Sequence, residues 1–350
     1  MKIKKWIIVF VLLTLITSGW FGYDFYNKIF AININEGKEP YELYIPSNAD
    51  YNKVIEILKK SGIVKDINSF IWVADRMNYD AHVSSGRYLI QPNLTNRQFV
   101  TLLRSGAQVP VKVTINKFRT KEALAGFISK KIEADSASII HLLNNPVYIA
   151  QYGWRTDNVM SVFLHNTYEF YWNTNAEAFF ERMNKEYKNY WNEDRIMQAN
   201  KIGLTPEQVI TLASIVEEET NVKSEKPIIA GVYLNRLKKG MKLQADPTVR
   251  FAIGNFKIKR IKHAHLSIDS KFNTYMYEGL PPGPICTPTP VSIESVLNPE
   301  SHNYYYFCAK EDFSGTHNFA TTHAEHIINA SKYHQALNTR KITEDTTSVL

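Results

Sequence analysis

The stretch TPEQVITLASIVEEET, residues 205–220, decides more about the fold than any other part of the sequence. Thr205 and Gln208 have the spacing of a capping box, and Pro206 takes the first helical position, where its missing N–H has no partner to lose. Apolar residues then recur at helical spacing as far as Val216. The stretch therefore predicts an amphipathic helix that begins sharply and ends in three acidic residues.

Those acids, Glu217, Glu218 and Glu219, stand where anions repel one another and interact unfavourably with the helix dipole. Helical spacing separates their environments. Glu219 continues the apolar stripe of Leu212 and Ile215, whereas Glu218 is expected to face solvent. Loss of water around an acid on an apolar stripe raises its pKa, as a general acid requires. Glu219 is thus the candidate acid, and an ordinary solvated helix end is the alternative.

Five further motifs follow this helix and contain side chains that can bind sugar hydroxyls and amides. They are YLNRL at 233–237, LQADPTV at 243–249, NTY at 273–275, GLPPGPI at 279–285 and GTHNF at 315–319. In this order, and together with the acidic helix end, they resemble the catalytic domain of the endolytic murein transglycosylases, the MltG/YceG-like family.

The resemblance implies a lyase that cuts the β-1,4 bond between N-acetylmuramic acid and N-acetylglucosamine and leaves 1,6-anhydro ends, terminating or trimming nascent glycan strands. The catalytic glutamate of that family is the second acid of a Glu-x-Glu-Thr pattern, here Glu219, with Glu217 as a supporting acid. One carboxylate is enough for such a lyase, whereas a hydrolase usually needs two. A hydrolytic muramidase and a non-catalytic glycan-binding scaffold remain the alternative functions.

Eight side chains in or near the motifs are candidates for contact with the glycan. They are Asn235, Arg236, Gln244, Asp246, Asn273, Tyr275, His317 and Glu325. A structural role is favoured for Asp246, because Asp commonly accepts backbone donors in turns. Glu325 is a candidate partner of His326. The run from His323 to His326 has neither His–Glu zinc spacing, so we expect no metal, and we expect no cofactor.

The N-terminus predicts a membrane anchor. A short basic tail, residues 1–5, precedes residues 6–23, which carry no charge. About 18 apolar residues are near the lower limit for crossing a bilayer, and the lysines favour a cytoplasmic N-terminus. We therefore expect a single pass through the inner (plasma) membrane, with the rest of the chain extracytoplasmic. A cleaved signal peptide is the alternative.

The remainder of the chain is predicted to be α+β. Residues 24–38 form a juxtamembrane strap, 39–106 a small α+β module, 107–340 the larger α+β catalytic domain and 341–350 a tail. The module at 39–106 resembles the LysM-like module of the family. Within it, Tyr41 to Ile45 alternates like a strand.

Charge bears on the partners. The net charge is +7, from 41 basic and 34 acidic residues, and the basic residues are spread out, with only short runs such as 257–262. This pattern does not predict nucleic-acid binding, but a mild positive field suits an anionic polymer or a membrane surface. The expected partners are peptidoglycan strands, the inner membrane and, from the resemblance, cell-wall synthases of the elongation or division machinery. Cys286 and Cys308 leave one disulfide and two free thiols equally open.

Overall fold

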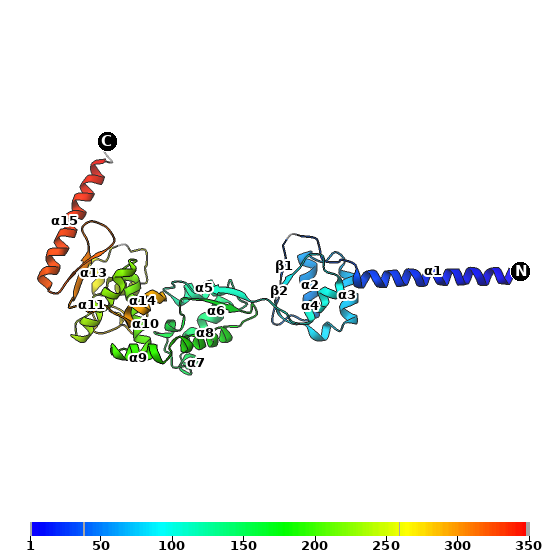
Figure 1. Cartoon of the computed structure of the whole chain (residues 1–350), viewed down its shortest axis with the longest axis horizontal. Helices are drawn as coiled ribbons and strands as arrows, with labels where there is room; N and C mark the ends of the chain where they lie inside the picture. The colour runs from blue at the N-terminus through cyan, green and yellow to red at the C-terminus, as the bar shows by residue number, and fades with distance from the viewer. Residues whose placement is uncertain (1, 38, 259, 348–350) are drawn as a thin grey trace. The chain divides into compact units, whose positions relative to one another are not determined.

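A computed structural model describes residues 2–37, 39–258 and 260–347, and Figure 1 traces the course of the chain. Helices and short strands build the fold, which confirms the predicted α+β class. The chain divides into two compact units. The first comprises the described residues up to 112, with 130–134 and 169–175, and the second comprises 113–129, 135–168 and the described residues from 176 onward. Three predicted segments are only partly described. The described residues exclude residue 1 of the basic tail, residue 38 of the strap and residues 348–350 of the C-terminal tail.

The N-terminal helix α1, Lys2–Phe30, is longer than the predicted apolar run and includes the first residues of the predicted strap. Its apolar side chains from Trp6 onward are mostly exposed. Within the described residues it is the one helix long and apolar enough to cross a membrane. Near its C-terminal end, Phe25 and Trp72 have ring centroids 5.4 Å apart, and Lys28 lies over the same Trp72 ring. Only this last part of α1 packs against the rest of the first unit.

The rest of the first unit is a small module built on one antiparallel pair of strands. Its elements are β1 Tyr41–Ile45, α2 Tyr51–Ser61, α3 Ile67–Arg76, η1 Asp80–His82, β2 Gly86–Ile90 and α4 Asn96–Arg104. Tyr41 pairs with Ile90, and Ile45 with Gly86. Alternate side chains of both strands are buried, which is why the alternating sequence forms a strand. A capping box on Thr95 starts α4.

Between this module and the acidic helix the chain forms mostly short elements. They are β3 Val111–Thr114, α5 Lys121–Ile128, α6 Ser136–Asn144, α7 Pro146–Ala150, η2 Val159–Val162, β4 Thr167–Phe170, α8 Ala176–Tyr190 and α9 Glu193–Lys201. β3 and β4 form a two-stranded sheet. Along α8, Phe180, Met183 and Tyr187 are buried at helical spacing, so this aromatic stripe belongs to the core of the second unit.

The acidic helix, α10 Pro206–Glu219, is central to the second unit. The elements after it are η3 Lys223–Glu225, α11 Lys226–Lys238, α12 Asp246–Ile253, α13 His263–Leu266, α14 Pro290–Leu297, β5 Tyr306–Ala309, β6 His317–Ala320 and α15 His323–Thr347. Every residue from 209 to 217 is buried, because α10 packs against α11, α12 and α14. β5 and β6 form an antiparallel hairpin, with Tyr306 opposite Ala320.

Candidate active site

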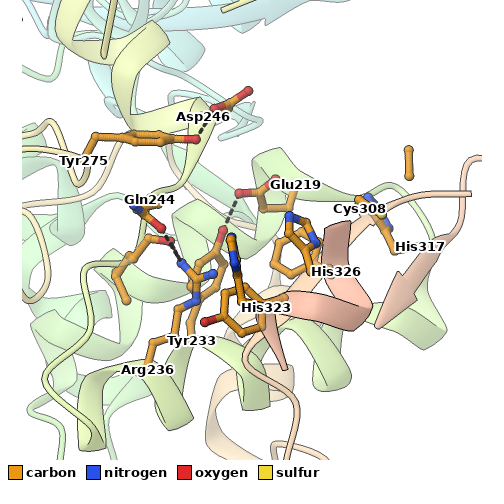
Figure 2. Close-up of a pocket in the computed structure, with 14 residues that line it drawn as sticks. Glu219, Tyr233, Arg236, Gln244, Asp246, Tyr275, Cys308, His317, His323 and His326 are labelled. Atoms are coloured by element: carbon orange, nitrogen blue, oxygen red, sulfur yellow. Dashed lines mark hydrogen bonds between the residues drawn. The ribbon is translucent and has the colours of Figure 1, made fainter. Parts of the chain in front are cut away.

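A groove of about 360 Å³ lies at the C-terminal end of α10, wholly within the second unit, and Figure 2 shows the residues around it. Side chains from α10, α11, the β5–β6 hairpin and the start of α15 contribute to its walls. Ten site residues were predicted, and the groove brings six of them together. These six are Glu219, Arg236, Gln244, Asp246, Tyr275 and His317.

Glu219 is the last residue of α10, and it is half-buried in the wall of the groove. The pKa of this carboxyl is raised to about 7. Burial and the negative charge of Asp246 raise it, and a hydrogen bond from Tyr233 partly opposes them. A carboxyl with this pKa can both hold and release a proton near neutral pH. That property is what general acid–base catalysis requires.

Tyr233, on α11, donates a hydrogen bond to Oε1 of Glu219, as Figure 2 shows. The tyrosine is almost completely buried, so its hydroxyl depends on this partner. The contact fixes the orientation of the carboxyl group. The motif YLNRL includes Tyr233 but gave no sign of this contact, because only the packing of α11 against α10 brings the two side chains together.

Glu217, predicted as a supporting acid, does not line the groove. It precedes Glu219 by two residues, which turns its side chain about 200° around the helix axis. Its Oε2 lies 2.7 Å from Nζ of Lys226 and also accepts hydrogen bonds from Thr289 and Ser292. Burial raises the pKa of Glu217, but the hydrogen bonds from these three residues outweigh that effect and lower it. Glu217 thus forms a buried ion pair with Lys226 outside the groove.

The expectation that Glu218 faces solvent is wrong. Only 7% of its side chain is exposed, and it forms ion pairs with Lys117 at 3.0 Å and with Arg119 at 2.9 Å. Burial raises its pKa, but hydrogen bonds from Arg119 and Lys117 lower it to below the ordinary value. The two cations come from a segment about 100 residues earlier, so helical spacing alone could not reveal them.

Three predicted residues border the groove near Glu219. Asp246 accepts a hydrogen bond of 2.7 Å from the hydroxyl of Tyr275. Gln244 has a φ of 51°, and its backbone N–H donates to the carbonyl of Thr274. The left-handed backbone at Gln244 is unusual for a residue other than glycine, and it directs the side chain into the groove. These amide, carboxylate and phenol groups are suitable partners for sugar hydroxyls.

Arg236 lines the groove, but much of its hydrogen-bonding capacity is used within the protein. It donates to the carbonyls of Tyr305 at 2.6 Å and Leu243 at 2.8 Å. Its neighbour Asn235 does not line the groove, and donates instead to the carbonyl of Tyr304 at 3.1 Å and to that of His302 at 2.8 Å. Both residues therefore tie α11 to the chain that leads into β5.

Asn273 and Glu325 also lie outside the groove. Asn273 is completely buried and donates to the carbonyls of Leu266 and Ile268, which makes it a turn residue. Glu325 is exposed and accepts from the backbone N–H groups of Thr321 and Thr322, so it does not pair with His326 as expected. The side chain of an Asn or Glu in or near a motif can thus hydrogen-bond to backbone groups instead of lining the groove. Sequence spacing does not distinguish these two roles.

Three histidines complete the groove wall. His317, on β6, bonds through Nδ1 to Oε2 of Glu225 at 2.8 Å. His323 and His326 begin α15, and the ring of His326 stacks on Tyr306 with centroids 5.5 Å apart. Burial, with the charges of His323 and Arg236, lowers the pKa of His326. Within the described residues no group of three His, Cys, Asp or Glu side chains could hold a metal ion.

The GLPPGPI motif at 279–285 does not line the groove at Glu219. Gly279 to Pro282 line a separate cavity near the start of α10. The N–H of Ile285 donates to Oγ of Ser214 at 3.0 Å, which ties this segment to α10. The cysteines are both free thiols: Cys286 is buried beside α10, and Cys308 lines the groove.

Comparison with known proteins gives consistent matches. The model of the YceG-like family matches residues 43–332. The chain is 29% identical over 315 residues to the endolytic murein transglycosylase of Bacillus subtilis (strain 168), covering 85% of this chain and 86% of that protein. It is 25% identical to the endolytic murein transglycosylase of Streptococcus pneumoniae serotype 2, covering 95% of this chain but 65% of that longer protein. A crystal structure of a YceG-like protein from Listeria monocytogenes has a TM-score of 0.55 and 27% identity, and covers 83% of this chain and 98% of its own.

Proposed function

Since the chain belongs to the YceG-like family, to which its residues 43–332 match, we propose that the groove at the end of α10 cuts peptidoglycan strands with Glu219 as its single acid–base. Relatives named endolytic murein transglycosylase support this activity. An enzyme with this activity is a lyase. The observation that carries the residue assignment is the half-buried Glu219 carboxyl, whose pKa of about 7 suits proton transfer in both directions.

The proposed reaction proceeds without water. Protonated Glu219 gives its proton to the glycosidic oxygen between N-acetylmuramic acid and N-acetylglucosamine, and the bond from that oxygen to C1 of the muramic acid breaks. The carboxylate then removes the proton from the 6-hydroxyl of the same muramic acid, whose oxygen bonds to C1. The products are a 1,6-anhydro end and a free 4-hydroxyl on the glucosamine. One carboxyl thus serves as acid and then as base.

Tyr233 is the proposed positioning residue for this carboxyl. Its hydrogen bond holds Oε1 of Glu219 and also stabilises the carboxylate that forms when the proton leaves. Asp246 is proposed to contact sugar hydroxyls together with Tyr275, with which it is hydrogen-bonded. Its negative charge also helps to keep Glu219 protonated.

Glu219→Gln tests the assignment. The amide has almost the same shape but cannot deliver a proton, so turnover is expected to fall by at least about 10²–10⁴-fold while glycan binding survives. The assay is mass spectrometry of 1,6-anhydromuramyl fragments from uncrosslinked strands, and Glu193→Gln, an exposed change on α9, is the matched control. Near-normal turnover in Glu219→Gln would refute the assignment.

Asp246→Asn separates the lyase from the alternative hydrolytic muramidase. In a two-carboxylate hydrolase this change should be about as damaging as Glu219→Gln. In the lyase it should cost less, because Asp246 only contacts sugar and helps to keep Glu219 protonated. The end group gives an independent answer, since a hydrolase leaves a reducing end. A scaffold without catalysis would release neither product.

We further propose roles for the parts outside the groove. α1 anchors the chain in the plasma membrane by a single pass, with the N-terminus in the cytoplasm. The module at 39–106 is LysM-like. The catalytic domain, from about residue 107 to about residue 340, then terminates or trims nascent strands beside cell-wall synthases. The exposed apolar surface of α1 supports the first of these proposals.

A further inference from the structure

A second cavity, of about 440 Å³, opens beside the catalytic groove. Asp246 and Tyr275 border both spaces, so this hydrogen-bonded pair forms a shared wall. The other side is formed by residues 260–263 and Leu266. A substrate held at Glu219 can therefore extend a substituent past the pair and into this second cavity.

The second cavity carries unneutralised positive charge. Arg260 and Lys262 line it and are exposed. Neither forms an ion pair with any residue that the structure describes. Asp246 is the one acid among the described residues that line it, and its Oδ1 already accepts a hydrogen bond from the hydroxyl of Tyr275.

Three other cations close to α10, namely Lys117, Arg119 and Arg236, differ in this respect. Lys117 and Arg119 are neutralised by Glu218, and Arg236 donates to backbone carbonyls. The basic run at 257–262 was noted from the sequence without a function. In the fold, Arg260 and Lys262 of this run line the same cavity, which an anion could enter.

We infer that this second cavity binds carboxylates of the stem peptide carried by the muramic acid next to the scissile bond, an inference that rests on the proposed function. The sugars of the strand are neutral, and the peptide attached through the lactyl group of muramic acid supplies the carboxylates. Arg260 can hold a carboxylate through two parallel N–H donors, and Lys262 adds a point charge. The second cavity therefore distinguishes strands that carry charged peptides from strands that do not.

The experiment compares two substrates and three proteins. Uncrosslinked, phosphate-free strands are used with their peptide carboxylates free or converted to neutral methylamides. The double variant Arg260→Gln/Lys262→Gln is compared with the full-length wild type and with Lys257→Gln/Lys271→Gln. The control variant removes the same charge from nearby exposed positions that do not line the second cavity.

Wild type should cut the charged strands with a kcat/KM about three- to tenfold above that for the neutral strands, since two exposed charge contacts contribute modestly. The difference should lie in KM and should shrink as salt is raised. The double variant should cut both substrates with the kcat/KM that wild type has for the neutral strands. The control variant should show the same preference for charged strands as wild type.

Equal rates of wild type and double variant on charged strands overturn the inference, as does an equal loss on both substrates. The absence of any preference with these phosphate-free strands would also overturn it, because the peptide carboxylates would then not be the ligand. If even the wild type releases no anhydro product from either substrate, the proposed function itself fails. That outcome is distinct from a loss of peptide discrimination.

Discussion

Glu219 couples the stability of the fold to pH. Its carboxyl has a pKa of about 7 in the folded chain, against an ordinary value of 4.5. Between these values the unfolded chain releases the proton while the folded chain keeps it, so the free energy of unfolding falls as pH rises. Below pH 4.5 the carboxyl is protonated in both states, and the effect disappears.

Glu219→Gln should therefore stabilise the protein at pH 8 and leave it nearly unchanged at pH 4. The gain at pH 8 should be up to about 3 kcal/mol in the free energy of unfolding, because the amide never has to hold a buried charge. Urea denaturation of both proteins at the two pH values measures it. A gain of the same size at pH 4 would mean that packing, rather than ionisation, is responsible.

Tyr233→Phe should shift the pH dependence of catalysis. The hydrogen bond from Tyr233 lowers the pKa of Glu219 and so partly offsets the effect of burial. Without this hydrogen bond the pKa should rise above about 7. The alkaline decline in kcat/KM, where the acid loses its proton, should move upward by as much as about one pH unit. A pH profile measured on defined strands gives the result. A smaller rate with an unmoved alkaline limb would assign Tyr233 a packing role only.

At the scale of the elements, the junction of α10, α11 and α14 depends on a buried ion pair. Glu217→Gln should reduce the free energy of unfolding by about 3–5 kcal/mol, since it leaves the ammonium of Lys226 buried without its anion. Thermal denaturation at pH 7 checks this, with Glu193→Gln, the exposed change on α9, as the control. Turnover per folded molecule should stay near that of wild type, because Glu217 does not line the groove.

The start of α10 could be predicted from sequence because its signals are local. Thr205 and Gln208 make both hydrogen bonds of the expected capping box, and Pro206 stands at the first position. The placement of Glu219 on the apolar stripe is local in the same way. Helix periodicity carries this information within a few residues.

Other features depended on contacts far along the chain. Glu218 looked solvated because its partners, Lys117 and Arg119, lie on a segment about 100 residues away. Asn235 and Asn273 stood in motifs that otherwise reach the groove, yet their amides satisfy backbone carbonyls. The sequence shows which residue types are present, but not which carbonyls need a donor.

At the scale of the whole molecule, α1 should keep the protein in the membrane. The full chain is expected to remain with membranes after a high-salt wash, because apolar burial in lipid is insensitive to salt, and to retain residues 1–23. N-terminal sequencing and fractionation test this. A mature chain that begins near Trp20 would show that the helix is a cleaved signal. A truncation that starts at residue 31 should be soluble and still cut free strands, because the groove lies within the second unit.

The length of α10 determines the direction in which its last side chain, Glu219, points. The capping box fixes where the helix starts, and 14 residues later it ends at Glu219. Each residue adds about 100° of rotation and 1.5 Å of rise. Deleting one residue inside α10 would therefore turn the carboxyl by more than a quarter of a circle, away from Tyr233, even if every apolar contact could be rebuilt. Surface loops can change length with little effect. In α10, by contrast, the number of residues determines the direction of the Glu219 side chain, so an insertion or deletion there would remove the catalytic geometry even in a chain that still folds.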